Sequence, residues 1–362
     1  MKGQLNRRLS GMTGMIKVGI DGRFLASPFT GNGRYTEGLA SGVQRIASDY
    51  QMDVHVYAPI GVVNHQVSIG QWVRPGRWNR WLGDLPRQLK EHGVQIFHGQ
   101  YTLPIGFDGK TCLTIHDAAF AIPGMPEYSR SKKELFTYFA RRASVVVTVS
   151  QSAKHDLQRI FGNNVRIEVV HNGCSIEKAT TEARNIVESL ISEAAFPVVL
   201  YVGRMARRKR IPLLIEGFRQ LKAQYKDAVL VLAGPEDDDS ATVSNEVARS
   251  GGSILRLLNV SEPLKTALLE RADVFAYLSS YEGFGLPVAE ALLAGVPVVH
   301  SDIPSLNEVS QGSAIVTKAE VNAVSGALKR ALAVRPNAGW ALAQKYTWDA
   351  AAQRYGDIYA TL

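Results

Sequence analysis

The chain has 362 residues, of which 46% are hydrophobic and 20% charged, a length and composition that predict two globular domains and exclude a small stapled scaffold, a fibrous repeat or a disordered chain. The two cysteines, Cys112 and Cys174, specify neither a disulfide framework nor a zinc site, so we expect buried thiols in a reducing, cytoplasmic compartment. The net charge of +8 lies in the first half, because residues 1–172 hold 21 Lys and Arg against 12 Asp and Glu, whereas residues 173–362 hold 20 against 21.

The basic first half predicts docking on an anionic partner such as a phosphate-bearing lipid surface or an acidic glycan, and ordinary solvated side chains explain the charge equally well. Nucleic acid is a poorer partner, because the sequence contains no recognised binding module. No uncharged apolar run reaches the roughly 20 residues that a membrane-spanning helix needs. Residues 1–15 lack the apolar stretch of a signal peptide, so we expect a flexible tail there.

Short runs rich in Val, Ile and Leu alternate with longer stretches of helical period, a pattern typical of parallel strands joined by crossover helices. The first half contains such runs at Ile16–Ile20, Val54–Tyr57, Ile96–His98, Thr111–Ile115, Val145–Val149 and Ile167–Val170. The second half contains them at Val198–Val202, Val229–Ala233, Ile254–Leu257, Val274–Tyr277, Val298–His300 and Ala314–Val316. We therefore expect an α/β protein with two doubly wound sheets.

Four segments follow the tail: an N-terminal domain (16–173), a charged and helix-permissive hinge (174–195), a C-terminal domain (196–347) and a terminal helix (348–362). The last segment has Ala351, Tyr355 and Tyr359 at helical spacing, which predicts a helix that returns to the N-terminal domain. Two stacked domains of this kind bind ligands in a cleft that faces the carboxyl ends of both sheets. The cleft is therefore where we expect the active site.

Two glycine-containing segments of the N-terminal domain mimic nucleotide-binding loops without matching them. Gly31–Gly33 misses the spacing of a dinucleotide-binding loop and lies far beyond its strand, so a loop that binds an anion is favoured. Gly109–Thr111 resembles the end of an ATPase phosphate loop, but Pro104 stands where the first glycine belongs. We therefore reject a dinucleotide oxidoreductase and an ATPase.

Trp72–Lys90 combines three Trp with four Arg. This composition suits an anionic bilayer surface. A helix that places its Trp side chains in the core of the first domain is an equal alternative.

A basic segment follows the first strand of the second half. Its cations are Arg204, Arg207, Arg208, Lys209 and Arg210. A solvated surface explains such a run, but its place at the carboxyl end of a strand predicts that some of it faces the cleft. We select Arg204 and Lys209, because cations there neutralise a departing diphosphate and each contributes about 3–4 kcal/mol. The carboxylate run Glu236–Asp239 is interpreted as a solvated loop, and we predict no bound metal.

The segment Ser279–Glu290 predicts a helix N-terminus directly after a strand. Gly283 and Gly285 permit a tight turn with close backbone approach, and a proline suits the first helical turn. The amide hydrogens of such a terminus, together with the helix dipole, bind phosphate. Glu282 and Glu290 lie eight positions apart and flank the same pocket, where one can meet a sugar and the other a ribose.

On these residues, the chain resembles a family 4 glycosyltransferase of the GT-B fold over nearly its whole length. The most specific element is the pair Glu282 and Glu290 with Gly-Phe-Gly-Leu-Pro between them, preceded by Arg204 and Lys209 at the family's spacing. Supporting motifs are Thr30–Tyr35, Thr114–Asp117, Val147–Ser150 and His171–Gly173. The resemblance implies two Rossmann-like domains facing an interdomain cleft, and a retaining, metal-independent sugar transfer from a nucleotide diphosphate sugar without a cofactor.

The resemblance also implies a role for each candidate residue. The catalytic set is Arg204, Lys209, Glu282 and His116. The donor-binding set is Gly31, Gly33, Gly203, Gly234, Val260, Gly283, Phe284, Gly285, Leu286 and Glu290. Within these sets the two cations hold the diphosphate, Glu290 binds the ribose, and Glu282 binds the hydroxyls of the transferred sugar near His116. His98 and His171 are interpreted as structural.

The leading hypothesis is transfer of a hexose, namely mannose from GDP-mannose, to a glycan or lipid-linked acceptor in surface polysaccharide synthesis, at the inner face of a membrane. No further carboxylate is marked by a motif as nucleophile, which favours attack by the acceptor on the face that the leaving group occupies. One alternative is a glycoside hydrolase that uses Glu282 and Glu290 as acid and base. The other is a non-catalytic binder of acidic polymers.

Overall fold

The computed structural model describes residues 14–27, 30–74, 76, 82–334 and 339–362. Most of the predicted tail at 1–15 lies outside the described residues, as do Trp78 and Trp81. The chain divides into two compact units, of which the first comprises Met1–Gly173 with Thr347–Leu362 and the second comprises Cys174–Tyr346. The chain therefore passes between the units twice.

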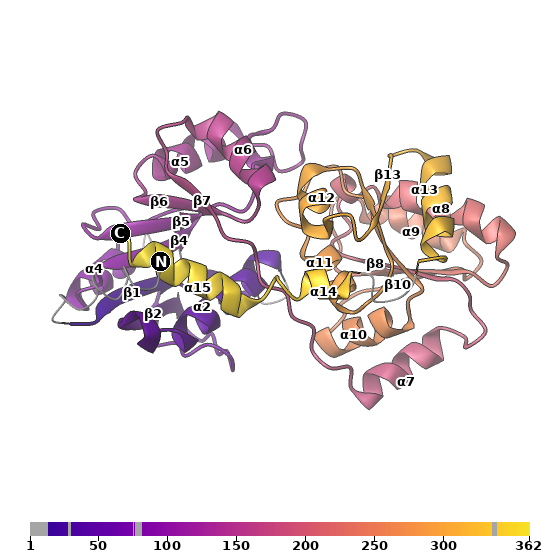
Figure 1. Ribbon diagram of the computed structural model, residues 1–362, viewed down its shortest axis with the longest axis horizontal. Helices are drawn as coiled ribbons and strands as arrows, with labels where there is room; N and C mark the ends of the chain where they lie inside the picture. The colour runs from indigo at the N-terminus through magenta and orange to yellow at the C-terminus, as the bar shows by residue number, and fades with distance from the viewer. Residues whose placement is uncertain (1–13, 28–29, 75, 77–81, 335–338) are drawn as a thin grey trace. The chain divides into compact units, whose positions relative to one another are not determined.

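The first unit is built, within its described residues, on a parallel sheet of seven strands in the order β3-β2-β1-β4-β5-β6-β7 (Figure 1). Its strands are β1 (Ile16–Asp21), β2 (Met52–Pro59), β3 (Gln71–Val73), β4 (Ile96–Gln100), β5 (Lys110–Thr114), β6 (Val145–Thr148) and β7 (Ile167–Val169). Its α-helices are α2 (Gly31–Arg45), α4 (Asp84–Glu91), α5 (Arg130–Ala140), α6 (Gln151–Phe161) and α15 (Trp348–Tyr359). The central strands are buried along almost their whole length, as Val- and Ile-rich strands covered on both faces must be.

The second unit, over the part of it that the structure describes, has a parallel sheet of six strands in the order β10-β9-β8-β11-β12-β13. Its strands are β8 (Val198–Val202), β9 (Val229–Ala233), β10 (Ile254–Leu257), β11 (Val274–Tyr277), β12 (Val298–Ser301) and β13 (Ile315–Thr317). Its α-helices are α7 (Thr181–Leu190), α8 (Ile211–Gln224), α9 (Ser240–Ala248), α10 (Glu262–Arg271), α11 (Leu286–Leu293), α12 (Pro304–Ser310), α13 (Val321–Ala331) and α14 (Trp340–Ala343). The prediction of two parallel α/β sheets is confirmed.

Each sheet winds in both directions from its first strand, since β1 lies between β2 and β4, and β8 lies between β9 and β11. In the second sheet, β8 pairs with β11 through Val199 with Val274 and Leu200 with Phe275. The loops that leave the carboxyl ends of β8 and β11 are therefore neighbours at a topological switch point, the place where open α/β sheets bind ligands.

Strand β3 shows that the segment Trp72–Lys90 begins as a strand and not as a helix. Its residues Gln71–Val73 form an edge strand that pairs with β2, and three residues are too few to show a strand period in the sequence. The helix of this segment, α4, begins only at Asp84, whose carboxylate binds the Arg74 guanidinium at 2.6 Å. Arg74 is thus held by the protein itself.

The stretch at 174–195 also differs from the expected hinge, because it belongs to the second unit. It contains α7, which begins after the N-cap residue Thr180. Arg184 of α7 binds Glu270 of α10 through two hydrogen bonds of 2.8 and 3.0 Å. The segment is therefore packed on the second sheet's helices, and the two passages between units fall at 173–174 and 346–347.

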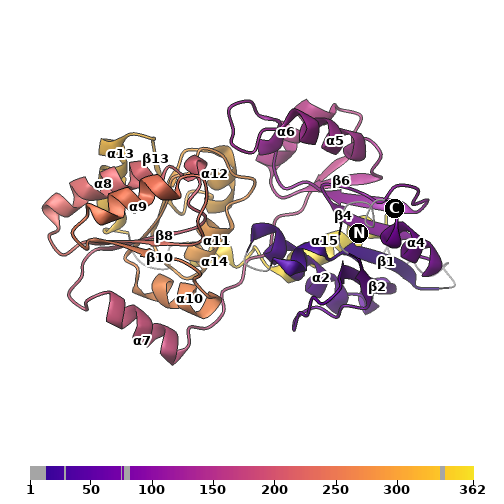
Figure 2. The same ribbon diagram turned by 180° about the vertical axis from the view of Figure 1, so that it is seen from behind.

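Helix α15 lies beside α2 in the first unit (Figures 1 and 2). The Tyr355 hydroxyl is 2.8 Å from the Tyr35 hydroxyl, and the Tyr359 hydroxyl is 2.5 Å from His98 Nδ1. Burial lowers the pKa of His98 to about 3, so its ring is neutral at physiological pH. At Gly38 of α2, a Cβ atom would lie 2.0 Å from the Trp348 ring, so only glycine fits beneath α15. His98 therefore has a structural contact, joining the terminal helix to the sheet.

None of the helices in the described ranges combines the length and the apolar character that a membrane span requires.

Candidate active site

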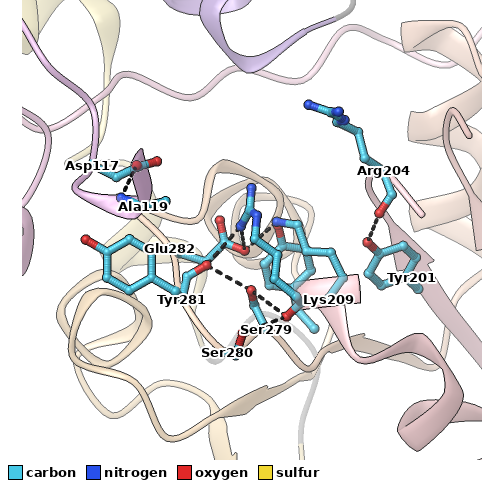
Figure 3. A network of polar contacts seen from close by, with 11 residues as sticks. Asp117, Ala119, Tyr201, Arg204, Lys209, Ser279, Ser280, Tyr281 and Glu282 are labelled. Atoms are coloured by element: carbon cyan, nitrogen blue, oxygen red, sulfur yellow. Dashed lines mark hydrogen bonds and ion pairs between the residues drawn. The ribbon is translucent and has the colours of Figure 1, made fainter. Parts of the chain in front are cut away.

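The loops that follow β8 and β11 in the second sheet are tied together by backbone contacts (Figure 3). The carbonyl oxygen of Arg208 accepts hydrogen bonds from the backbone N–H of Ser280 at 2.8 Å and from its hydroxyl at 3.2 Å. The Ser279 hydroxyl donates to the Tyr281 carbonyl at 3.0 Å. These bonds fix the basic segment against the loop that carries Glu282.

Glu282 lies at the centre of a buried ion cluster (Figure 3). Its Oε1 atom accepts hydrogen bonds from Lys209 Nζ and from Arg208 Nη1, the second at 3.0 Å. Lys209 is only 5% exposed and also donates to the Tyr277 hydroxyl. Arg208 donates to the Tyr281 carbonyl at 2.9 Å. The structure thus brings Lys209 and Glu282 into direct contact and adds Arg208 to them.

The charges of this cluster determine its protonation. Burial by itself raises the pKa of Glu282, but Lys209 and Arg208 outweigh burial and bring that pKa down to about 2. Burial and the Glu282 charge raise the pKa of Tyr277 well above its ordinary value, so the phenol stays neutral. Among these three side chains two basic groups face one carboxylate, a composition that suits an anionic ligand.

Arg204 stands apart from the Glu282 cluster. Its side chain is 62% exposed and binds Asp237 at 2.7 Å, and in Figure 3 its guanidinium lies away from Lys209 and Glu282. Asp237 belongs to the carboxylate run that the sequence assigned to a solvated loop, and the next residue, Asp238, accepts a 2.8 Å hydrogen bond from the Arg207 backbone N–H. The run therefore holds the basic segment, and an anion bound by Arg204 competes with Asp237.

Gly203 and Gly234 directly follow β8 and β9, where the two loops pack against each other. The Gly203 backbone N–H donates to the Ala233 carbonyl at 2.9 Å. A Cβ atom on Gly234 would lie 2.2 Å from the Gly203 carbonyl oxygen, and Gly234 has φ of +137°. Only glycine satisfies both conditions at 234.

The predicted helix after Gly285 is α11, and Gly285 is its N-cap with φ of +103°. Phe284 is buried and packs edge-to-face on Tyr346, with ring centroids 5.4 Å apart. Leu286 and the following proline form the first helical turn. This turn leaves backbone amides at the helix N-terminus, as a phosphate site of this kind requires.

Glu290 is the charged residue of α11 and is only 3% exposed. Lys265 Nζ donates to its Oε2 atom at 3.0 Å and also lies 2.6 Å from Glu262. Lys265 is in the first turn of α10, just after the half-buried Val260 and the N-cap Ser261. Glu290 is thus held by a lysine that the sequence motifs did not mark.

In the first unit, a chain of hydrogen bonds joins two predicted elements. His116 Nε2 lies 2.9 Å from Gln100 Oε1, Gln100 Nε2 donates to the Thr36 hydroxyl at 2.7 Å, and that hydroxyl donates to the Asn32 carbonyl at 2.7 Å. His116 is therefore connected to Gly31–Gly33, which form the first turn of α2 where the sequence predicted a loop.

The surroundings of His116 also fix its proton. Burial lowers the pKa of His116 to about 3, so the ring is neutral. Because the amide oxygen of Gln100 can only accept, Nε2 carries the proton. At Gly33, a Cβ atom would lie 2.1 Å from the Ser27 carbonyl, so glycine is required there, whereas Gly31 faces open space.

Sequence reasoning missed four contacting residues: Arg208, Tyr277, Lys265 and Gln100. Arg208 lies within the basic run that the sequence analysis selected. The sequence does not show that its side chain points toward Glu282. The other three occupy ordinary strand or helix positions whose spacing carries no signal.

Among the described residues, no group of three His, Cys, Asp or Glu side chains is arranged to hold a metal ion. Metal independence is a property of the reaction, and it stays a prediction.

Two family models match the chain. The one described as "Glycosyltransferase Family 4" matches residues 31–178, and the one described as "Glycosyl transferases group 1" matches residues 183–338. The chain is 28% identical over 283 residues to "O-antigen chain mannosyltransferase B" of Escherichia coli. The aligned region covers 72% of this chain and 73% of the relative. It is 25% identical over 287 residues to "GDP-mannose:cellobiosyl-diphosphopolyprenol alpha-mannosyltransferase" of Xanthomonas campestris, covering 74% and 72%.

Solved structures share the fold. A sucrose-phosphate synthase (tll1590) from Thermosynechococcus elongatus superposes with a TM-score of 0.76 at 18% identity, covering 96% of this chain and 98% of that one. Anabaena Alr3699/HepE in complex with UDP and glucose gives a TM-score of 0.75 at 17% identity, covering 96% and 100%.

Proposed function

The chain belongs to the family 4 glycosyltransferases of the GT-B fold, and on that premise we propose that it transfers mannose from GDP-mannose to a glycan or lipid-linked acceptor. The observation that carries the proposal is the buried cluster of Arg208, Lys209 and Glu282 beside the N-terminus of α11. It offers positive charge for a diphosphate and a carboxylate for sugar hydroxyls. Mannose and GDP are supported by the names of the Escherichia coli and Xanthomonas campestris relatives.

The proposed reaction retains the configuration of the sugar and needs no metal ion. The acceptor hydroxyl attacks the anomeric carbon on the face that the diphosphate leaves, and its proton passes to the departing phosphate oxygen. Lys209, Arg204 and the amides at the start of α11 stabilise the negative charge that develops on the leaving diphosphate. Glu282 orients the sugar, because a carboxylate ionised down to about pH 2 accepts hydrogen bonds and is a poor proton donor.

The same protonation argues against a glycoside hydrolase. Such an enzyme needs one carboxyl group that is protonated near neutral pH, and Arg208 and Lys209 keep Glu282 ionised, so Glu282 cannot be that acid. The comparisons contain glycosyltransferase families and give the hydrolase no support.

The donor is tested by measuring transfer with GDP-mannose, UDP-glucose and dTDP-glucose in parallel, using a diphosphopolyprenol-linked glycan as acceptor. We expect turnover with GDP-mannose, and the α configuration of the product is read by NMR. A product with inverted configuration contradicts the retaining mechanism. Turnover restricted to another sugar nucleotide contradicts GDP-mannose as the donor.

The charge-stabilising role is tested with Arg204→Ala and Lys209→Ala. Each substitution is expected to lower kcat by about 10²–10³-fold while changing donor affinity much less, because the cations act on charge that appears in the transition state. The exposed variant Lys329→Ala on α13 is the control. Turnover equal to the parent in both variants excludes this role.

For the acceptor side, we propose that the first unit docks on an anionic membrane surface through α5. Arg130, Lys132 and Lys133 are exposed there, and the guanidinium of Arg142 stacks 3.9 Å over the ring of the exposed Tyr138. Vesicles with phosphatidylglycerol should bind the protein, and the double variant Lys132→Glu and Lys133→Glu should bind at least tenfold more weakly, with a smaller salt dependence. Equal binding of neutral vesicles rules the surface out.

A further inference from the structure

Glu290 occupies a position where a lone carboxylate is unfavourable. The other side chains of α11 are apolar, and Glu290 itself is 3% exposed. Removing a carboxylate from water is strongly unfavourable unless a cation and hydrogen bonds compensate. Lys265 provides that compensation from another helix, with its Nζ atom 3.0 Å from Glu290 Oε2.

Lys265 is itself fixed by a second carboxylate. Its side chain is 5% exposed, and its Nζ atom lies 2.6 Å from Glu262 Oε2, three residues earlier on α10. Two carboxylates on two helices therefore restrain one ammonium group. Glu262 lies in the first turn of α10, Glu290 is the fifth residue of α11, and both helices begin near the carboxyl end of the sheet.

A purely structural role explains this arrangement poorly. Replacing a buried ion pair by apolar side chains of similar volume is often neutral or stabilising, so the pair is a poor way to hold α10 and α11 together. A buried carboxylate with a fixed direction is, however, a good acceptor for a pair of sugar hydroxyls.

We propose that Lys265 is a positioning residue that holds the Glu290 carboxylate in the orientation that binds the ribose hydroxyls of the donor nucleotide. The inference rests on the proposed function and on the ribose-binding role that the family resemblance implies for Glu290. Lys265 acts through Glu290 and does not itself touch the reacting atoms. It therefore controls donor affinity and ribose recognition, and it leaves the chemical step nearly unchanged.

The test compares GDP with 2′-deoxy-GDP by titration calorimetry. Loss of a hydrogen bond to a charged group weakens the parent's affinity by about 10–100-fold. In Lys265→Met we expect GDP affinity to fall by a similar factor and the ratio between the two nucleotides to shrink to within about threefold. Lys265→Arg should recover most of the parent's affinity ratio between GDP and 2′-deoxy-GDP. The control Lys329→Met, at an exposed lysine of α13, should keep the parent's ratio unchanged.

Steady-state kinetics provide a second readout, with KM for the donor raised and kcat within about threefold of the parent in Lys265→Met. If folded Lys265→Met discriminates between GDP and 2′-deoxy-GDP as strongly as the parent, the lysine is structural and the inference fails. If the parent binds GDP and 2′-deoxy-GDP equally well, Glu290 does not bind the ribose, and the role of Lys265 fails as well. If the parent binds neither GDP nor UDP, the proposed function fails instead.

Lys265→Met removes the cation beside the buried Glu290 carboxylate and can reduce folding. The double variant Lys265→Met with Glu290→Gln removes that charge and is compared with Glu290→Gln alone. If Lys265 acts only through Glu290, the two proteins bind GDP equally within about twofold. A further loss of tenfold or more in the double variant shows that Lys265 contacts the nucleotide directly, which overturns the positioning role.

Discussion

The carboxylate of Glu282 allows a quantitative prediction, because Glu282→Gln removes its charge with almost no change in shape. In the folded protein Lys209 and Arg208 overcome burial and lower the pKa of Glu282 from 4.5 to about 2. At about 1.4 kcal/mol per tenfold change in proton affinity, ionised Glu282 contributes about 3 kcal/mol to folding. Glutamine resembles the protonated acid, so we expect Glu282→Gln to be about 3 kcal/mol less stable than the parent at pH 7.

The pH dependence follows from the sign of the shift. Folding lowers the pKa of Glu282, so its ionised carboxylate stabilises the folded state. This contribution is complete above about pH 4.5 and is lost as the pH falls toward 2. The difference between parent and Glu282→Gln should therefore shrink to about 1 kcal/mol at pH 3. Guanidinium unfolding followed by tryptophan fluorescence measures this difference from pH 7 to pH 3.

Glu216→Gln is the matched control, because Glu216 pairs with Arg219 on the exposed surface of α8 and such pairs contribute about 0–1 kcal/mol. A Glu282→Gln protein within 1 kcal/mol of the parent at pH 7 would refute the reasoning. So would a difference that does not change between pH 7 and pH 3.

Three further predictions concern single positions. Asp237→Asn removes the carboxylate that binds the Arg204 guanidinium at 2.7 Å. GDP binding measured by calorimetry should tighten by about two- to fivefold, as expected for an exposed ion pair. Weaker binding would contradict competition between Asp237 and the nucleotide for Arg204. Because burial lowers the pKa of His116 to about 3, its NMR ring signals should not titrate between pH 5 and 8, and a midpoint near 6.5 would show that the ring is solvated. Gly234→Ala should cost at least about 3 kcal/mol of stability, because its Cβ would meet the Gly203 carbonyl oxygen at 2.2 Å. Position 251 faces open space, so the control Gly251→Ala should cost about 1 kcal/mol. Equal stability losses in the two variants exclude the steric argument.

The sheets were predictable because parallel strands buried on both faces are continuous runs of Val, Ile and Leu. Strand β3 was not, since its three residues at the sheet edge carry no period. The placement of α7 was equally hidden: the charged composition of 174–195 permits a helix, but its packing against α10 depends on the pair Arg184 and Glu270, which are far apart in sequence.

Within the site, the contact between Lys209 and Glu282 was accessible to sequence reasoning because both follow strands that adjoin at the switch point. The separation of Arg204 from them was not, since it depends on Asp237 in the loop after another strand. Lys265 was the hardest to anticipate. It sits on a helix whose polar and apolar residues show little segregation, and only the folded structure places it against Glu290.

The return of α15 to the first unit has a consequence for biosynthesis. Residues 174–346 emerge from the ribosome as one uninterrupted stretch and can complete their own core, whereas the first unit must wait for residues 347–362. Until then the hydroxyl of Tyr35 and the imidazole of His98 lack the tyrosine partners that α15 supplies. We therefore expect released chains that stop at Tyr346 to resist protease in residues 174–346 and to be cleaved in the first unit, an inversion of the usual order in which domains mature.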